Sequence, residues 1–309
     1  MKIVILGATG FIGEYLADNL SIIEQYTIYE ISRYLTSKSL LNISISKKTN
    51  GSKIIKNEIN ELFDSLKNIE PDIIINCISY GVNYIDNDET KAFETNSTLP
   101  VNLYSLCKDL NIKKFIHLGS SEEYGLMDGL INENYICDPV SLYGRSKRDG
   151  TKKLLNISRN EKRRDLLILR LFSIYGPREN LLKLIPMTIS NILNNTEIKL
   201  TEGKQLKNYL YVADLVNIIK KILINIDKFN DDVYQIASSK NISVYEILKL
   251  IGEISNSHSS LFKWGELKYR KSESFNYYVD TSRLQSIIGK LEEKVDIRDG
   301  IKKVYDSMK

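Results

Sequence analysis

The sequence has few of the residues that build special scaffolds. Its 309 residues include three cysteines, two histidines, one tryptophan and five prolines. The cysteines are odd in number and widely spaced, so they fit neither a disulfide framework nor a zinc site, and His117 and His258 are too few for an all-histidine metal site. Only 16 glycines accompany the five prolines, which excludes collagen-like and linker-dominated chains. We therefore expect an ordinary hydrophobic core, no bound metal and a reducing, cytosolic environment.

The chain also lacks a strong charge imbalance and a long apolar run. Lys and Arg number 43 and Asp and Glu 39, so the net charge of +4 predicts neither a nucleic-acid partner nor a membrane partner. Nowhere do 18 apolar residues follow one another, and the apolar run before Gly7 is too short for a signal peptide. These features are typical of an ordinary globular protein and support neither a nucleic-acid nor a membrane function.

Short apolar runs alternate with longer amphipathic segments in the N-terminal half. Helices are expected at Phe11–Leu20, Glu58–Lys67 and Lys91–Asp109. Buried strands rich in Ile, Val and Leu are expected at Lys2–Leu6, Tyr26–Ile31, Lys53–Ile55, Asp72–Asn76, Phe115–Leu118 and Asp165–Leu171. This alternation predicts an α/β fold with a doubly wound parallel sheet, and ligands at the carboxyl ends of its strands.

The pattern becomes less regular after about residue 177. Helices are expected at Leu181–Asn195, Val212–Ile224 and Ser243–Ser255, with short strands between them. No linker rich in Ser, Gly or Pro separates the two parts. We therefore expect a first domain over residues 1–177 and a smaller α/β lobe over residues 178–309, from which some segments return to the first domain.

The glycine-rich segment after the first expected strand is the most informative motif. Gly7, Gly10 and Gly13 directly follow a strand and open a helix. In that context the first glycine permits a tight turn, the second lets backbone approach a pyrophosphate, and the third lets the helix pack closely on the sheet. The helix N-terminus then offers free N–H groups to phosphate. The motif predicts a Rossmann-type dinucleotide site, with Thr9, Phe11 and Ile12 also beside the cofactor.

The spacing Gly-x-x-Gly-x-x-Gly resembles that of the short-chain dehydrogenase/reductase superfamily. The motif Gly-Ala-Thr-Gly-Phe-Ile-Gly is similar to the one found in the extended branch of this superfamily, the NAD-dependent epimerase/dehydratase family of nucleotide-sugar enzymes. The resemblance implies a nicotinamide cofactor bound by residues 1–177 and a nucleotide-sugar bound by the C-terminal lobe. It also implies a homodimer, because the segments Lys91–Asp109 and Tyr143–Ser158 resemble the helices that pair in this family.

The end of the second strand bears on which nicotinamide cofactor binds. An NAD enzyme places an acidic residue there, next to the ribose 2′-OH, whereas this chain has Ser32 followed by Arg33. A hydroxyl and a guanidinium suit a 2′-phosphate, so we expect NADP(H) rather than NAD, with Arg33 as a surface charge the alternative. By resemblance, Glu58 and Ile59 lie near the adenine.

Tyr143 and Lys147 are the expected catalytic pair. They are four residues apart on an expected helix, so they share one face, and a nearby ammonium lowers the pKa of a phenol. The same spacing recurs at 34/38, 104/108, 245/249 and 305/309, but only Tyr143 follows the fifth strand and opens the helix that leads to the sixth. The resemblance makes Tyr143 the general acid/base and Lys147 the residue that tunes it and holds the nicotinamide ribose.

The segment Ser120-Ser121-Glu122-Glu123-Tyr124-Gly125 ends that fifth strand. By resemblance, Ser120 orients the reacting oxygen and Ser121 lies beside the substrate; the alternative is that both only cap a strand. Three roles are open for Glu122: it is catalytic, it binds substrate, or it is a solvated charge of the loop. Dehydratases of this branch need a carboxylate here, and Ser120-Ser121-Glu122 is similar to the Thr-Ser-Glu of GDP-mannose dehydratases. The same segment is also similar to 4-keto-6-deoxy-sugar reductases. The Asp-Glu form of the dehydratase motif is absent, because Ser121 stands at the Asp position.

Further segments extend the resemblance to nearly the whole chain. Ser173 stands where family members usually carry an Asn that touches the nucleotide-sugar. Lys207 replaces a phosphate-binding Arg, which keeps the charge and loses the bidentate fork. Arg270 resembles a residue of the pyrophosphate-binding region, and for Lys207 and Arg270 alike a surface charge is the alternative.

The sequence thus predicts an NADP(H)-dependent enzyme that acts at C4 of a nucleotide-diphosphate sugar, with 4-keto reduction as the first choice. A 4,6-dehydratase is the second, because of Glu122, and a 4-epimerase the third. A non-catalytic dinucleotide sensor is the alternative from another class. The combination of Ser120, Tyr143 and Lys147 argues against a sensor, which would not need all three.

Overall fold

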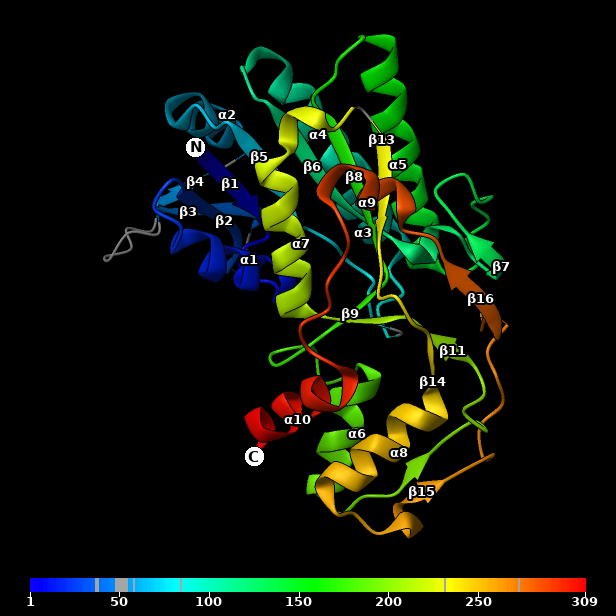
Figure 1. Cartoon of the computed structure of the whole chain (residues 1–309). Helices are drawn as coiled ribbons and strands as arrows, with labels where there is room; N and C mark the ends of the chain where they lie inside the picture. Colours follow the sequence, from blue (N-terminus) through cyan, green and yellow to red (C-terminus); the bar gives the residue numbers. More distant parts are fainter. Residues whose placement is uncertain (37–38, 48–54, 58, 84, 231, 272) are drawn as a thin grey trace. The chain divides into compact units, whose positions relative to one another are not determined.

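A computed structural model describes residues 1–36, 39–47, 55–57, 59–83, 85–230, 232–271 and 273–309. The chain forms two compact units (Figure 1). Unit 1 comprises Met1–Ser120, Leu142–Arg170 and Ile219–Tyr234, and unit 2 comprises Ser121–Ser141, Leu171–Ile218 and Gln235–Lys309. Each unit therefore takes in segments from both halves of the sequence.

An eight-stranded sheet forms the centre of unit 1, in the order β13-β8-β6-β5-β1-β2-β3-β4. Its strands are β1 (Lys2–Leu6), β2 (Thr27–Thr36), β3 (Ser39–Lys47), β4 (Ile55–Asn57), β5 (Ile73–Asn76), β6 (Lys114–Ser120), β8 (Leu166–Leu171) and β13 (Asp232–Ile236). β1 pairs in parallel with β2 and β5, and β5 pairs in parallel with β6. The predicted α/β fold with a doubly wound parallel sheet is confirmed.

One edge of the sheet differs from the prediction. β2 continues to Thr36 and pairs antiparallel with β3, a strand the sequence analysis did not predict. The expected parallel strand at Lys53–Ile55 is wrong in its pairing, because β4 begins at Ile55 and pairs antiparallel with β3. The signal for β3 was present: Ile43 and Ile45 alternate with serines, the period-2 pattern of a strand with two unlike faces.

Helices cover the sheet on both faces. They are α1 (Phe11–Ser21), α2 (Ile59–Ile69), α3 (Glu89–Phe93), the π-helical turn η1 (Glu94–Thr98), α4 (Leu99–Leu106), η2 (Cys107–Asp109), α5 (Leu142–Asn160), α7 (Val212–Ile224) and η4 (Ile226–Lys228). Val4 and Leu6 of β1 join a core with residues of α2, α4 and α5. Ile3 and Ile5 are equally buried, and alternation along a strand directs them to the opposite face. Burial on both faces explains why β1 is continuously apolar from Ile3 to Leu6.

Unit 2 consists of short strand pairs and a group of helices. Its elements are η3 (Ser121–Glu123), β7 (Asp128–Ile131), β9 (Ser173–Tyr175), α6 (Leu184–Leu193), β10 (Ile198–Lys199), β11 (Leu206–Lys207), β12 (Tyr209–Tyr211), β14 (Ile242–Ser243), α8 (Val244–Ser255), η5 (Ser259–Leu261), β15 (Phe262–Lys263), β16 (Asn276–Val279), α9 (Ser282–Ile288) and α10 (Ile297–Met308). α6, α8 and α10 pack together, and β9 pairs in parallel with β12. A membrane-spanning helix is absent from the described residues.

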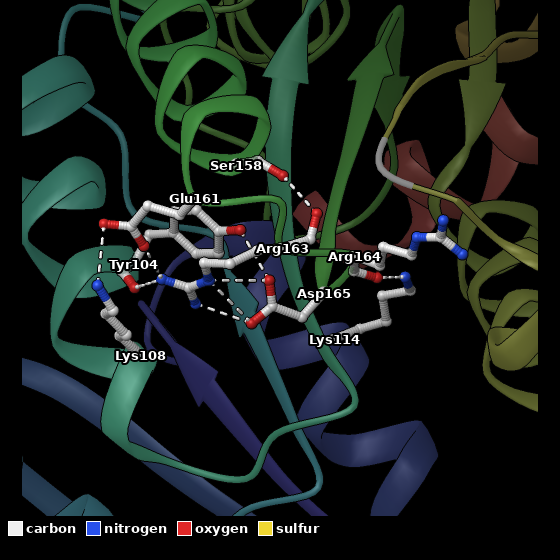
Figure 2. Close-up of polar contacts among 8 residues, drawn as sticks. All are labelled: Tyr104, Lys108, Lys114, Ser158, Glu161, Arg163, Arg164 and Asp165. Atoms are coloured by element: carbon white, nitrogen blue, oxygen red, sulfur yellow. Dashed lines mark hydrogen bonds and ion pairs between the residues drawn. The ribbon is translucent and has the colours of Figure 1, made fainter.

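A polar network ties α4, α5 and β8 together near the amino-terminal end of β8 (Figure 2). The Arg163 guanidinium donates to both carboxylate oxygens of Asp165, at 2.8 Å from Nη2 and 3.1 Å from Nε, and to the Tyr104 carbonyl at 3.0 Å. It lies 3.8 Å from the centre of the Tyr104 ring, whose hydroxyl donates to Asp165 at 2.7 Å. The Arg163–Asp165 pair joins the helices to the sheet. Because Arg163 is nine-tenths buried, removing either partner would leave an uncompensated buried charge and destabilise the fold.

Replacing Arg163 by alanine is expected to lower the free energy of unfolding by about 3 kcal/mol, because it leaves the Asp165 carboxylate without its positively charged partner. Urea denaturation followed by circular dichroism measures the change. Lys108→Ala is the matched control, since its ion pair with Glu161, at 3.5 Å, is exposed and worth less than about 1 kcal/mol. Equal losses in the two variants would contradict a structural role for the buried pair.

Candidate active site

The glycine loop has the geometry of a phosphate cradle. Gly7 takes φ +79°, a conformation that favours glycine, and its N–H donates to the Ile31 carbonyl at 2.8 Å. A Cβ on Gly13 would lie 2.3 Å from the Gly7 oxygen and 2.9 Å from the Ala8 Cα, so no side chain fits there. Gly10 begins α1 as its N-cap without a side-chain hydrogen bond. The close packing that the motif predicts is therefore present in the fold.

The N-terminus of α1 is open to a ligand. Thr9 and Gly10 are exposed, and Phe11 and Ile12 are half-buried at the first turn of the helix. Because the N-cap is a glycine, no side chain of that residue competes for the first amide groups, and the helix dipole favours an anion there. These residues fit the pyrophosphate of a dinucleotide.

The residues expected to select the cofactor lie on β2 and α2. Ser32 is half-buried and directly follows Ile31, the last β2 residue that pairs with β1. Arg33 is the next residue of β2, and its backbone lies opposite Ile43 of β3. Ile59 begins α2. The side chains of Arg33 and Ile59, and all of Glu58, lie outside the described part of the chain.

Tyr143 and Lys147 lie one turn apart on α5, near the carboxyl end of β6. Lys147 is 1% exposed, and its ammonium donates to the Leu118 carbonyl of β6 at 2.5 Å. Ser120 is buried and ends the same strand two residues later. Tyr143 faces Gly81, where a Cβ would lie 3.8 Å from its ring. Unit 1 thus brings a hydroxyl, a phenol and an ammonium to one end of β6, as the sequence predicts.

Asn96 holds α5, the helix of Tyr143 and Lys147, in place, and the sequence analysis missed it. It is fully buried in the π-helical turn η1, where its oxygen accepts from the Tyr80 N–H at 2.9 Å. Its amide nitrogen donates to the Tyr80 carbonyl at 2.7 Å and to the Ser146 hydroxyl at 2.9 Å. Ser146 in turn donates to the Tyr143 carbonyl at 3.0 Å. The available signal was an asparagine in the middle of a helix, which needs such a partner.

Asn96→Asp is expected to lower kcat about tenfold while the fold is retained. A carboxylate can still accept from the Tyr80 N–H, but it cannot donate to the Tyr80 carbonyl or to Ser146, so the first turn of α5 loses a fixed contact. Steady-state kinetics measure the change, and circular dichroism monitors folding. Asn225→Asp is the matched control, because Asn225 donates only to a carbonyl near the end of α7. Wild-type kcat in the Asn96 variant would contradict the positioning role.

Glu122 and Ser121 belong to unit 2. Both lie in η3, where Ser121 is half-buried and Glu122 is exposed. The Glu122 carboxylate accepts from the Ser141 hydroxyl at 3.0 Å. The Glu122 carboxylate is thus exposed, and its hydrogen bond with Ser141 fixes its position.

The expected substrate residues of unit 2 lie on different elements. Lys207 of β11 forms an ion pair with Glu273 at 3.0 Å. Arg270 is exposed, and its carbonyl accepts from the Glu273 N–H at 3.2 Å, so Arg270 and Lys207 both lie close to Glu273. Ser173 is half-buried in β9, and its N–H donates to the Asn208 carbonyl at 3.0 Å.

Asn208, the residue after Lys207, has a role that the sequence analysis did not foresee. Its side chain is buried, accepts from the Ser238 N–H at 2.7 Å and donates to the Ser238 carbonyl at 2.9 Å. It also donates to Asn241 at 2.8 Å. A carboxylate here could only accept, so the amide fits this position and fixes β12 against the segment after β13.

Comparison with known proteins agrees with this arrangement. The sequence model of the "NAD dependent epimerase/dehydratase family" matches residues 3–237. A dTDP-D-glucose 4,6-dehydratase of Dictyostelium discoideum is 30% identical over 82% of this chain, and the match spans 62% of that relative's length. A CDP-abequose synthase of Salmonella muenchen is 28% identical over 100% of this chain and 98% of the relative.

A solved structure shares the whole fold. UDP-glucuronic acid 4-epimerase from Bacillus cereus, in complex with NAD, superposes with a TM-score of 0.84 at 21% identity, covering 100% of this chain and 96% of the epimerase. The fold and the glycine cradle define a Rossmann-type dinucleotide-binding protein with a Tyr-x-x-x-Lys helix. More specifically, the chain belongs to the NAD-dependent epimerase/dehydratase family.

Proposed function

We propose that this protein is an NADP(H)-dependent reductase that acts on the C4 ketone of a nucleotide-diphosphate 4-keto sugar. The observation that carries the proposal is the position of Tyr143 and Lys147. They share one face of α5, and the Lys147 ammonium is bound to the Leu118 carbonyl, two residues before Ser120. A phenol with a buried ammonium one turn away is suited to proton transfer at a carbonyl oxygen.

The chain's own residues handle the proton. When bound, the reduced nicotinamide supplies hydride to the C4 carbon of the sugar. Tyr143 gives its phenolic proton to the C4 oxygen as that hydride adds, so the ketone becomes a hydroxyl and the phenol becomes a phenolate. The Lys147 ammonium stabilises the phenolate until a solvent proton restores it, and Ser120 donates a hydrogen bond to the reacting oxygen.

The preference for NADP(H) rests on Ser32 and Arg33. Ser32 is the first residue beyond the β1 pairing of β2, where an acidic residue would accept from a ribose 2′-OH. We expect Arg33→Ala to lower the ratio of kcat/KM for NADPH to that for NADH at least about tenfold, because a charge-assisted bond to the 2′-phosphate is lost. Arg148→Ala, an exposed arginine of α5, is the control. An unchanged ratio in Arg33→Ala, or purification with tightly bound NAD, would contradict this preference.

The substrate class is a nucleotide-diphosphate sugar. The names of the two relatives described above, dTDP-D-glucose 4,6-dehydratase and CDP-abequose synthase, contain a nucleotide diphosphate, and Lys207 and Arg270 offer this chain two cations for a diphosphate. We propose that Lys207 and Arg270 bind the diphosphate of the substrate, and that Ser121 and Ser173 lie beside its sugar. We further propose a homodimer paired through the segments Lys91–Asp109 and Tyr143–Ser158, which sedimentation velocity tests.

A 4,6-dehydratase is the second candidate, and Glu122 favours it. The carboxylate is accessible and held by Ser141, as a base that removes the C5 proton of a 4-keto sugar needs to be. Ser121 weighs against it, because a hydroxyl is a poor general acid for the departing C6 oxygen. Under the reductase proposal Glu122 binds substrate or orients the loop.

One assay separates the candidates. Purified protein is mixed with NADPH and a panel of nucleotide 4-keto-6-deoxy sugars, and absorbance is followed near 340 nm. A reductase consumes NADPH in proportion to the ketone added. A dehydratase leaves NADPH unchanged and forms a 4-keto sugar from a parent nucleotide hexose. A sensor binds the dinucleotide but does neither.

A further inference from the structure

Two buried polar side chains link the ends of β5 and β6. Asn76, the last residue of β5, and His117 of β6 are 1% and 0% exposed. The Asn76 amide nitrogen lies 3.1 Å from His117 Nδ1. The two residues lie opposite each other in the parallel pairing of the strands. The mechanism above uses neither side chain.

The hydrogen bonds determine the tautomer of His117. The Asn76 oxygen accepts from the Ile78 N–H at 3.1 Å, and a backbone N–H can only donate. The other end of the amide is therefore the NH₂ group, which can only donate to His117. Nδ1 must then be the acceptor, and the proton of a neutral imidazole is on Nε2.

The surroundings of His117 oppose a positive charge. Burial and the nearby Lys147 ammonium lower the pKa of His117 well below its ordinary value. Protonation at Nδ1 would also place two donors, the new N–H and the Asn76 NH₂, against each other. Cys77, the next residue after Asn76, is likewise held uncharged, because burial raises the pKa of its thiol to about 12 although Lys147 opposes the rise. Lys147 thus faces two neutral groups at this end of the sheet.

The bond from Asn76 reaches the phosphate loop. Ile78, whose N–H donates to Asn76, packs closely against Gly7. A Cβ added to Gly7 would lie only 3.1 Å from the Ile78 backbone nitrogen. The intervening Cys77 N–H donates to the Leu6 carbonyl at 2.9 Å, directly before Gly7. The Asn76 side chain therefore holds the backbone turn against which the first glycine of the cradle packs.

We propose that His117 is a positioning residue of the dinucleotide site. As a neutral Nε2–H imidazole it fixes the Asn76 amide, which holds the Ile78 turn beneath Gly7, and it leaves Lys147 without a second positive charge beside it. His117 acts through Asn76 and Lys147 rather than by touching substrate. This role rests on the proposed dinucleotide function.

The tautomer is directly measurable, because the chain has only two histidines. Replacing the exposed His258 by glutamine leaves His117 as the single source of imidazole signals in ¹⁵N–¹H spectra. We expect the pattern of a protonated Nε2 and a bare Nδ1, unchanged between pH 6 and 8. A protonated Nδ1, or a titration within that interval, would overturn the proposal.

Two substitutions at one position test the functional consequence. The amide oxygen of His117→Gln can accept from Asn76, whereas His117→Leu offers no acceptor. We expect the Kd for NADPH, measured by fluorescence titration of the folded protein, to rise about five- to tenfold in the leucine variant and by less than about twofold in the glutamine variant.

The outcomes separate this role from the proposed function. If both variants lose thermal stability but bind NADPH as tightly as the wild type, His117 is only structural and the proposal fails, while the proposed function stands. Equal weakening in both variants also overturns it, because the Asn76 bond would not be the cause. If the wild type binds neither NADPH nor NADH, the proposed function fails and this role fails with it.

Discussion

Tyr143→Phe is expected to lower kcat by at least about 100-fold, because the variant keeps the ring but cannot donate or accept the proton at the sugar oxygen. The Kd for NADPH is expected to stay within about threefold of the wild-type value, since the ring still packs beside Gly81 and Lys147 keeps its bond to the Leu118 carbonyl. Steady-state kinetics and a fluorescence titration of the same preparation measure the two quantities.

A second Tyr-x-x-x-Lys pair supplies the control. Tyr245 and Lys249 have the same spacing on α8 of unit 2, where Tyr245 is exposed and its ring lies 4.9 Å from that of Trp264. Tyr245→Phe keeps the ring contact, so kcat is expected to change by less than about twofold. If Tyr143→Phe retained full turnover, or if Tyr245→Phe lost as much, Tyr143 would not be the acid/base.

Gly13→Ala is expected to raise the Kd for NADPH at least about tenfold. The added Cβ would lie 2.3 Å from the Gly7 oxygen, a backbone atom that cannot rotate away, so α1 must move from the loop or the loop must open. Either shift displaces the amide groups that meet the pyrophosphate. Isothermal titration of the purified variant measures the change.

Gly252→Ala is the matched control, because Gly252 lies in α8 and its added Cβ would make ordinary contact with the Phe262 ring at 3.4 Å. That variant is expected to bind NADPH as the wild type does and to gain slightly in helix stability. Tight NADPH binding by Gly13→Ala would contradict the assignment of the cradle.

The sequence predicted those parts of the fold that repeat a simple physical pattern. Strands buried on both faces are mostly apolar, which made β1, β5 and β8 visible in the sequence. The need for glycine at position 13 was predictable because a side chain there would collide with Gly7 and Ala8, which are close to it in the sequence. The proximity of Tyr143 and Lys147 on α5 was predictable because a helix brings residues four positions apart to one face.

The parts that were missed depend on contacts between distant segments. β3 lies next to the edge strand β4, and its serine-isoleucine alternation competes with many similar patterns in an isoleucine-rich chain. Asn96 gains its role from Tyr80 and Ser146, which lie 16 and 50 residues away. The His117 tautomer likewise depends on a partner 41 residues distant. Such networks become visible only when the strands and helices are in place.

The most direct test of the account follows the hydride itself. Purified protein is incubated with a nucleotide 4-keto-6-deoxy sugar and with NADPH that carries deuterium as the transferable hydrogen at C4 of the nicotinamide ring. The sugar product is then examined by mass spectrometry and NMR. We predict one deuterium at C4 of the sugar, with one NADPH consumed per product formed. A product without deuterium at C4, or a 4-keto sugar formed from a parent nucleotide hexose with NADPH unchanged, would contradict the account.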